Sequence, residues 1–355
     1  MGREVVSLQV GGRVFRGIKS VDLSVGFDLA ARAFNVTLAP SAALLETFAP
    51  GTALVMAFNG DLVFTGYVDR LRPSFKRLRV AGRSKAQDFI DCAAIDEQAT
   101  GNFQNQTVLQ IAQSLDRFGV GITSDQQLDP IDDYQITPGE TAFGAVEKLS
   151  RDQGLTLFGQ GDGSIKITKP GAQRQAGGLF QGVNIKDGAE ADLNWAHRHS
   201  HIIVRGQSAS GTTNANLQVQ ATAQDPTVAR YRPHVHVEDA DIDQPTAQAL
   251  ANARSQREAA ASLKCTIPVQ GFRDAAGMLW TPGNLVWVEA DLLGLAQVML
   301  IKHASFSKRV RGGSTTRLSL CDPRAFGGKA AKGSQGGAIW DVGSPAIDDG
   351  SDDIP

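Results

Sequence analysis

The stretch FAPGTALV, at residues 48–55, is matched in outline by WTPGNLVW, at residues 280–287. Each begins with an aromatic residue, continues through Pro-Gly, and ends in an apolar run that predicts a strand. In both places a hairpin into a second, longer strand follows, and a final strand comes after it, at 78–80 and 316–320. Because the order of elements is shared as well as the motif, we interpret the two stretches as an internal repeat. The sequence therefore predicts a mainly β chain with two similar small β-barrels.

The first barrel is expected at residues 1–96, where apolar and polar residues alternate. Residues 34–38, FNVTL, have the period of a half-buried strand. Asn-Gly at 59–60 separates two apolar runs, and this pair favours a hairpin because both turn positions need positive φ. Gly-Gly at 11–12 predicts a second two-residue turn of the same kind.

Residues 97–179 change character and predict a small α/β insert with two helices and a hairpin. Thr107 and Gln110 fit a capping box at the start of the first helix, because each side chain can satisfy a free backbone N–H of the other. Gly119 fits the stop signal of this helix.

The second helix of the insert is expected over residues 138–152. Thr137, Pro138 and Glu140 match the residue types that favour the N-cap, N1 and N3 positions. A Gly-Asp-Gly turn between short apolar runs then predicts a hairpin within 155–167, on which the helices can pack.

Residues 180–325 predict the second barrel, with its clearest strands at 285–289, 297–307 and 315–320. A helix rich in alanine is predicted at 245–263. Its small side chains bury little area, so we expect it to lie on the barrel rather than to form a core of its own.

Residues 326–355 contain Gly, Ser, Lys and Asp with few apolar groups, and they predict a flexible C-terminal tail. The formal net charge is −2, from 35 basic and 37 acidic residues, which gives no broad attraction for nucleic acid. Cys92, Cys265 and Cys321 are far apart, and we interpret them as buried free thiols of a reducing compartment. Neither a signal peptide nor a run of 18 apolar residues is found, so neither export nor a membrane span is expected.

The most suggestive chemical pattern is HRHSH at residues 197–201. On a strand, His197, His199 and His201 would share one face, and three histidines with an open position form a catalytic zinc site. The alternative function is therefore a zinc-dependent hydrolase, with the two histidines at 234–236 as further candidates. However, ligands at alternate positions of a strand span about 13 Å at ~3.3 Å per residue, and no acidic pattern accompanies them. We therefore predict a polar strand face without a metal.

Other motifs suggest chemistry only weakly. The segment 82–85 lacks the spacing of a phosphate loop, and the glycines at 159–163 precede no helix, so both indicate turns. The aspartates at 129–133 lack the glycine that a calcium loop needs, and no serine lies in a G-x-S-x-G elbow. The sequence therefore predicts no catalytic residue, no metal ligand and no cofactor. A carbohydrate-binding module would need an aromatic platform, but the tryptophans are scattered, at Trp195, Trp280, Trp287 and Trp340.

Several segments resemble one protein family, in the same order along the chain. The segment VAGRSKAQDFIDCAA, at 80–94, is similar to a stretch of Mu-like contractile phage baseplate hub proteins. The resemblance covers about residues 3–325. Its further segments are 103–121, 139–154, 203–207, 279–286, 298–301 and 315–320.

This resemblance implies a structural protein and not an enzyme. Hubs of this family are trimers in which each subunit contributes two similar barrels, so that three subunits form a pseudo-six-fold ring. The ring joins the six-fold tail tube to a three-fold central spike, and the spike proteins of type VI secretion carry a related hub. The implied partners are other copies of the chain, the tail tube protein, the central spike protein and the baseplate wedge proteins, with phage DNA passing through the channel. The implied location is the virion tail baseplate, assembled in the host cytoplasm without stable membrane association.

Overall fold

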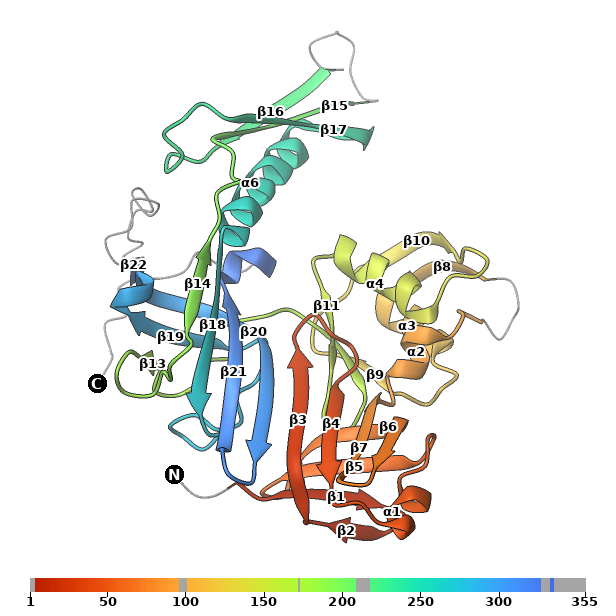
Figure 1. Cartoon of the computed structure of the whole chain (residues 1–355). Coiled ribbons are helices and arrows are strands. Elements are labelled where there is room, and N and C mark those ends of the chain that lie inside the picture. Colours follow the sequence, from red (N-terminus) through yellow and green to blue (C-terminus); the bar gives the residue numbers. More distant parts are fainter. Residues whose placement is uncertain (1–3, 96–100, 172, 209–217, 327–332, 335–355) are drawn as a thin grey trace.

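The structure is a computed structural model that describes residues 4–95, 101–171, 173–208, 218–326 and 333–334. The described chain is mainly β, as predicted (Figure 1). Of the predicted tail at 326–355, the described residues are Phe326 and the two-residue strand β22 (Gly333–Ser334). The expected flexibility of the tail therefore lies outside the described residues.

The first half of the main sheet is built from residues 6–84. Its strands pair in the order β3-β4-β7-β6-β5-β1-β2. The predicted two-residue turns are confirmed, because Gly11 and Gly12 have φ of 54° and 74°, and Asn59 and Gly60 have φ of 50° and 97°. The elements are β1 (Val6–Val10), β2 (Arg13–Phe15), β3 (Ile18–Gly26), β4 (Ala33–Leu38), α1 (Ala42–Thr47), β5 (Ala53–Phe58), β6 (Asp61–Ser74) and β7 (Arg77–Ser84).

The second half is built from residues 179–326, interrupted by a smaller unit. Its strands pair in the order β14-β18-β21-β20-β19-β13, and β22 adds to β20. The elements are β13 (Leu179–Phe180), β14 (Glu190–Leu193), β18 (Leu263–Gln270), β19 (Leu285–Ala290), η1 (Asp291–Leu293), β20 (Leu295–Arg309), β21 (Gly313–Cys321) and η2 (Pro323–Phe326).

The two halves repeat one arrangement of five strands, β3-β4-β7-β6-β5 in the first and β14-β18-β21-β20-β19 in the second. The Pro-Gly motifs occupy equivalent places: Gly51 N–H donates to Val68 O at 2.7 Å, and Gly283 N–H donates to Ile301 O at 2.8 Å. From these residues, equivalent rows of opposed residues run across four strands. The rows are Val68, Gly82, Phe34 and Leu23 in the first half, and Ile301, Leu320, Cys265 and Ala191 in the second.

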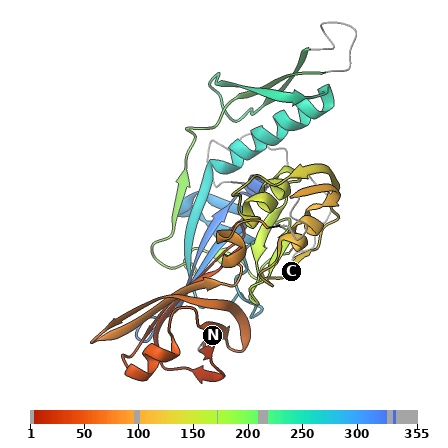
Figure 2. The same cartoon turned by 90° about the vertical axis from the view of Figure 1, so that its right-hand side faces the viewer.

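The halves form one continuous sheet, because β20 pairs antiparallel with β3. Each half-sheet occupies the place of one of the two small barrels expected from the sequence, and among the described residues each stays open, with one hydrophobic cluster running through both. The physical reason is the length of β20. Its first part pairs with β19, and beyond an irregularity at Ile301–His303 its second part extends past β19 and pairs with β3 instead. Figure 2 shows the two halves running into each other.

The α/β insert packs beside the first half (Figure 1). The capping box of α3 is confirmed, since Thr107 Oγ1 accepts from Gln110 N–H and the Gln110 side chain accepts from Thr107 N–H at 2.8 Å. The predicted hairpin is also confirmed, by the antiparallel pairing of β11 with β12. The elements are α2 (Gln87–Asp91), β8 (Asn102–Thr107), α3 (Val108–Leu115), β9 (Ile122–Ser124), β10 (Pro130–Gln135), α4 (Ala142–Asp152), β11 (Thr156–Gly159) and β12 (Ile165–Thr168).

The predicted start of the second insert helix was wrong by four residues. α4 begins after Thr141, whose hydroxyl accepts from Gly144 N–H at 3.0 Å. The residues assigned to the cap form a turn instead, in which Glu140 N–H donates to Thr137 O at 2.9 Å. Gly139 has φ of 86°, a conformation that suits a Pro-Gly turn and excludes a helical first turn.

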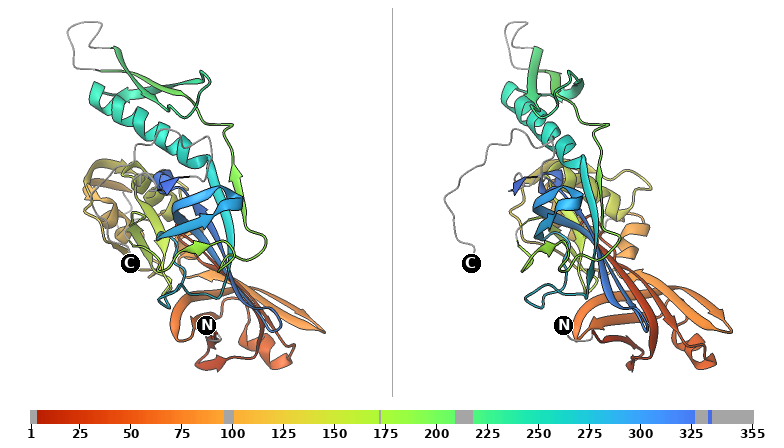
Figure 3. Two further views of the ribbon diagram at one scale, coloured as in Figure 1. Left: turned by 90° about the vertical axis from the view of Figure 1, so that its left-hand side faces the viewer. Right: turned by 60° about the vertical axis from the view of Figure 1, so that its left-hand side comes forward.

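A third unit projects beyond the second half, as Figure 3 shows. It consists of a three-stranded sheet, β16 (Gln218–Gln224), β15 (His201–Gln207) and β17 (Pro233–Asp241), with α6 (Gln244–Ala261) against one face. The predicted helix at 245–263 is confirmed, but it does not lie on the main sheet as expected. Its buried alanines Ala247 and Ala251 join a separate cluster with Ile202 and Val204, because small side chains allow the helix to approach this sheet closely. The sequence-based domain boundaries stay a prediction.

Candidate functional site: assembly surfaces

The joint between the two halves carries an ionic contact where β3 ends. Asp28 follows β3, and its carboxylate lies 2.6 Å from His303 Nε2 and 3.1 Å from Lys302 Nζ, both on β20. Partial burial alone would raise the pKa of Asp28, but its bonds to His303 and Lys302 outweigh this effect and lower the pKa from 3.8 to about 2. The contact therefore fastens the strand pairing that unites the halves.

A partly buried arginine fixes the insert to the first half. Arg32 Nε donates to Gly159 O at 2.9 Å, and its Nη1 donates to Val63 O at 2.8 Å. The backbones meet so closely that a Cβ on Gly161 would lie 2.4 Å from Leu62 O. The glycine-rich segment at 159–163, which the sequence indicates as turn chemistry, thus also serves as a close docking contact.

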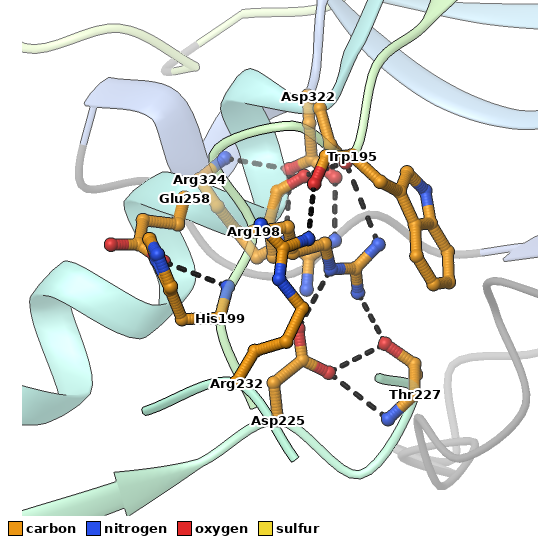
Figure 4. Close-up of polar contacts among 11 residues, drawn as sticks. Trp195, Arg198, His199, Asp225, Thr227, Arg232, Glu258, Asp322 and Arg324 are labelled. Carbon is orange, nitrogen blue, oxygen red and sulfur yellow. Dashed lines mark hydrogen bonds and ion pairs between the residues drawn. The ribbon is translucent and has the colours of Figure 1, made fainter. Parts of the chain in front are cut away.

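A cluster of polar contacts lies near the start of β15, where the segment after β14 enters the projecting unit (Figure 4). Arg198 Nε donates to Asp225 Oδ2 at 2.7 Å, and both side chains are buried. Trp195 lies under the guanidinium, 4.8 Å from ring centroid to Cζ. Arg232 adds hydrogen bonds of 2.8 Å to the carbonyl oxygens of Trp195 and Ala196.

The three histidines at 197–201 do not share a strand face, which corrects the geometry that a zinc site would have required. His197 lies in a turn and His199 in irregular backbone, whereas His201 is the first residue of β15. The chain turns there because Arg198 points inward to Asp225. An acidic partner, which the sequence did not indicate, is also present: His199 Nδ1 lies 2.9 Å from Glu258 Oε2 of α6.

The histidines at 234–236 make separate contacts. The His234 ring lies 4.9 Å from that of His199, and His236 Nε2 lies 2.8 Å from Arg254 and 3.2 Å from Glu238. Among the described residues, no group of three or more His, Cys, Asp or Glu side chains converges on one point that could hold a metal ion. The geometry therefore gives the zinc-hydrolase reading no support.

The cysteines differ in exposure, which corrects the interpretation of all three as buried. Cys265 and Cys321 are buried, and burial raises the pKa of each thiol to about 12. Cys92 is exposed, at the end of α2. Two inert thiols and one accessible thiol follow from this arrangement.

The outward face of the first half-sheet carries a cluster of arginines that sequence reasoning missed. An open groove of about 680 Å³ runs over β3, β4, β6 and β7, and its exposed arginines are Arg70, Arg72, Arg77, Arg79 and Arg309. Arg309 pairs with Asp22 at 2.8 Å. No ion pair or side-chain hydrogen bond joins the other four guanidinium groups to any residue that the structure describes. Only the strand registers, which bring Arg72 opposite Arg79, reveal this cluster.

Four family models match consecutive parts of the chain. Residues 5–84 match the N-terminal domain of the Mu phage baseplate assembly protein GpP-like family, and residues 86–169 match the second domain of the baseplate hub protein gp44-like family. Residues 198–256 match the third domain of NMB1110-like tail proteins, and residues 258–323 match a C-terminal domain of tail proteins.

Relatives match the chain along nearly its whole length. Baseplate hub protein gp44 of Escherichia phage Mu is 28% identical over 340 residues, which cover 90% of this chain and 88% of that protein. The crystal structure of a 43 kDa tail protein of prophage MuSo2 from Shewanella oneidensis superposes with a TM-score of 0.79 at 27% identity, covering 91% of this chain and 99% of that one. Along nearly its whole length this chain is similar to baseplate hub and tail proteins of Mu-like phages. The resemblance stated from the sequence is confirmed.

The hub fold extends to a more distant protein. An Escherichia coli protein described as a component of the type VI secretion system matches with a TM-score of 0.52 at 12% identity, over 88% of this chain and 76% of that one. At this identity the likeness shows the fold alone. In the described part of the present chain, no helix is long and apolar enough to cross a membrane.

Proposed function

We propose that three copies of this hub protein form a pseudo-six-fold ring that joins the six-fold tail tube to a three-fold central spike. The observation that carries this proposal is the repeat of five strands, fused edge to edge into one sheet by the β3–β20 pairing. A chain with two equivalent half-sheets offers six of them in a trimer. Such a ring matches a six-fold partner on one face and a three-fold partner on the other.

The insert and the projecting unit break the equivalence of the halves. The insert docks on the first half through Arg32, and the projecting unit leaves the second half near Arg198. They therefore present three copies of each surface rather than six. We propose that these surfaces contact the spike and the wedge proteins, while the tail tube protein contacts the ring of half-sheets and phage DNA passes through the channel.

The proposed role is mechanical, with no catalytic step, in the virion tail baseplate after assembly in the host cytoplasm. Its support is that the relatives are named as a baseplate hub protein and a tail protein. The C-terminal segment 326–355 has two apolar residues, Ile347 and Ile354, flanking aspartates. We propose that it docks on the spike or on a neighbouring subunit.

The mass of the native protein tests the ring directly. Three copies of a 37.7 kDa chain have a mass of about 113 kDa. Because obligate interfaces bury on the order of 2,000 Å² or more, this mass should persist by light scattering at micromolar concentration. A stable monomer under these conditions would overturn the proposal.

A further inference from the structure

Two strand edges of the continuous sheet have no pairing partner among the described residues. β14 pairs with β18 on one side, and its other edge is open. The second part of β6, from Arg70 to Ser74, pairs with β7 on one side. On its other side β6 pairs with β5, but this pairing covers only the first part of β6 and leaves Arg70–Ser74 open. Open edges present unpaired N–H and C=O groups and favour pairing with another chain.

The joint between the two halves shows how one such edge is filled. There β3, the first strand of its repeat, pairs with the second part of β20, the fourth strand of the other repeat. In the repeat, β14 is equivalent to β3, and β6 is equivalent to β20. The internal joint is thus a template for pairing β14 with β6.

The template also fixes the register. Both long strands have an irregularity directly after equivalent residues, Val68 in β6 and Ile301 in β20, so that Arg72 is equivalent to Ser305. The equivalent rows across the halves make Ala191 the counterpart of Leu23, and Asp192 the counterpart of Ser24. In the internal joint, Ser305 lies opposite Ser24.

We propose that β14 of one copy pairs antiparallel with the second part of β6 of a second copy, with Asp192 opposite Arg72. The neighbouring residues then place Leu193 opposite Leu71, as Val25 lies opposite Ala304 in the internal joint. This inference rests on the proposed ring and assigns its contact between subunits. A second copy is required because seven strand spacings of about 4.8 Å, roughly 34 Å, separate β14 from β6 within one sheet.

The side chains at these edges complement each other in charge. Arg70 and Arg72 are two arginines of the cluster that form no ion pair with a described residue. Glu190 and Asp192 on β14 are exposed and likewise form none. Pairing β14 with β6 brings two carboxylates to the arginine-rich edge. Opposite charges on directly opposed residues stabilise strand pairs.

The apolar side chains at these edges also match the template. In the internal joint Val25 is 3% exposed, whereas its counterpart Leu193 is 36% exposed. Leu71 lies partly buried against the main hydrophobic cluster, and its opposition to Leu193 would cover both side chains. Pro73 can offer only its carbonyl to this ladder, so the pairing has one donor fewer than the internal joint.

Cysteine cross-linking of the full chain tests the register. The variant Leu71→Cys with Leu193→Cys is made in a Cys92→Ser background, because Cys92 is the exposed native thiol. Opposed strand residues have Cα atoms about 4.5–5.5 Å apart, which suits a disulfide. Oxidation should give a covalent ladder that ends at three chains. The matched control, Leu71→Cys with the exposed Val237→Cys on the projecting unit, should give no ladder.

The outcomes separate this inference from the ring itself. A native trimer that forms no cross-link between positions 71 and 193 overturns the β14–β6 pairing and leaves the three-copy ring standing. The same holds if the trimer forms while these two strand edges pair with another protein. A monomer overturns both. A ladder that continues beyond three chains supports the pairing and overturns the three-copy ring.

A charge exchange provides a second measurement that needs no disulfide. Arg72→Asp and Asp192→Arg should each lower the trimer fraction at micromolar concentration at least tenfold, and the double exchange should restore it. Both residues are exposed, so the fold should be kept, and Arg205→Asp on the projecting unit serves as the control. A trimer that is indifferent to either single exchange, or a double exchange that fails to restore it, would contradict the proposed opposition.

Discussion

Asp28 Oδ1 lies 2.6 Å from His303 Nε2 across the joint between the two halves of the sheet. The two residues are far apart in the sequence, and neither belongs to a recognisable motif. Their contact, with Lys302 at 3.1 Å, closes the pairing of β3 with β20 at the point where β20 leaves β19. The stability of the joint should therefore depend on the charge of one carboxylate.

Asp28→Asn should lower the free energy of unfolding by about 1 kcal/mol at pH 7. The carboxylate is about one-third exposed, so solvent screening reduces the larger value that its pKa of about 2 would imply. Because the pKa is lower in the folded state, the stabilisation is present above pH 3.8 and is lost as the pH falls towards 2. Denaturant unfolding should show the variant approaching the unsubstituted protein in stability below pH 3. If the two proteins differed equally in free energy of unfolding at pH 2 and at pH 7, the Asp28 carboxylate would not be the group that stabilises the joint.

Gly161→Ala should loosen the insert from the first half. A Cβ at this position would lie 2.4 Å from Leu62 O, so one backbone must move and the Arg32 hydrogen bonds to Val63 and Gly159 would lengthen. We expect a loss of roughly 1–3 kcal/mol, as for other overpacked sites. Gly17→Ala is the control, because a Cβ there meets nothing within 4 Å. Hydrogen exchange of residues 101–169 should rise in the first variant and not in the second.

The thiols should react unequally. With dithiobis(nitrobenzoate) at pH 8, one thiol per chain should react quickly, and all three should react after unfolding in guanidinium. Burial raises the pKa of Cys265 and Cys321 to about 12, which leaves almost no thiolate at pH 8, whereas Cys92 is exposed. A Cys92→Ser variant that still reacts quickly in the folded state would contradict this assignment.

Replacing His197, His199 and His201 with Gln should leave ring assembly nearly unchanged. His197 and His201 lie at or before the start of β15, and His199 contacts Glu258 on a partly exposed surface, where the loss should stay within about 1 kcal/mol. Light scattering of the triple variant measures assembly, and metal analysis of the unsubstituted protein provides the independent check. Stoichiometric zinc that disappears in the variant, together with loss of assembly, would revive the metal site.

The repeat could be predicted from the sequence because its turns are local. Pro-Gly and Asn-Gly set the backbone conformation of their own residues, so the hairpins follow from a few positions. The joint could not be predicted, because the pairing of β20 with β3 depends on residues that are almost the whole chain apart. The helix at 245–263 was predicted from composition, but its packing partner was not. The helix packs on the separate sheet of β15, β16 and β17, and the sequences of these strands do not indicate that they pair with one another.

The two residues of the proposed contact between subunits were also beyond prediction from local motifs. Arg72 and Asp192 carry no motif, and each is an ordinary exposed charge when considered alone. Extending the repeat of 48–55 and 280–287 strand by strand aligns Arg72 with Ser305 and Asp192 with Ser24, since the two halves keep one register through four strands. The opposition of those two serines comes from the pairing of β20 with β3. The equivalences were therefore present in the sequence, but the opposition of Arg72 and Asp192 follows only from the strand pairing at the joint.

The buried pair of Arg198 and Asp225 should govern the stability of the projecting unit. Burial alone would raise the pKa of Asp225, but the hydrogen bonds from Arg198 and Thr227 outweigh it and lower the pKa, so the pair stabilises the fold above the ordinary carboxyl pKa and weakens under acid. Asp225→Ala leaves Arg198 buried without its partner and should cost about 3–5 kcal/mol. Glu147→Gln, which breaks the exposed pair with Arg151 on α4, should cost less than about 0.5 kcal/mol.

Hydrogen exchange of the Asp225→Ala variant locates the destabilised region. Because the projecting unit has its own hydrophobic cluster, the loss of protection should be confined to residues 201–261 while the main sheet stays protected. Equal loss of protection throughout the main sheet would show instead that the two parts unfold as one.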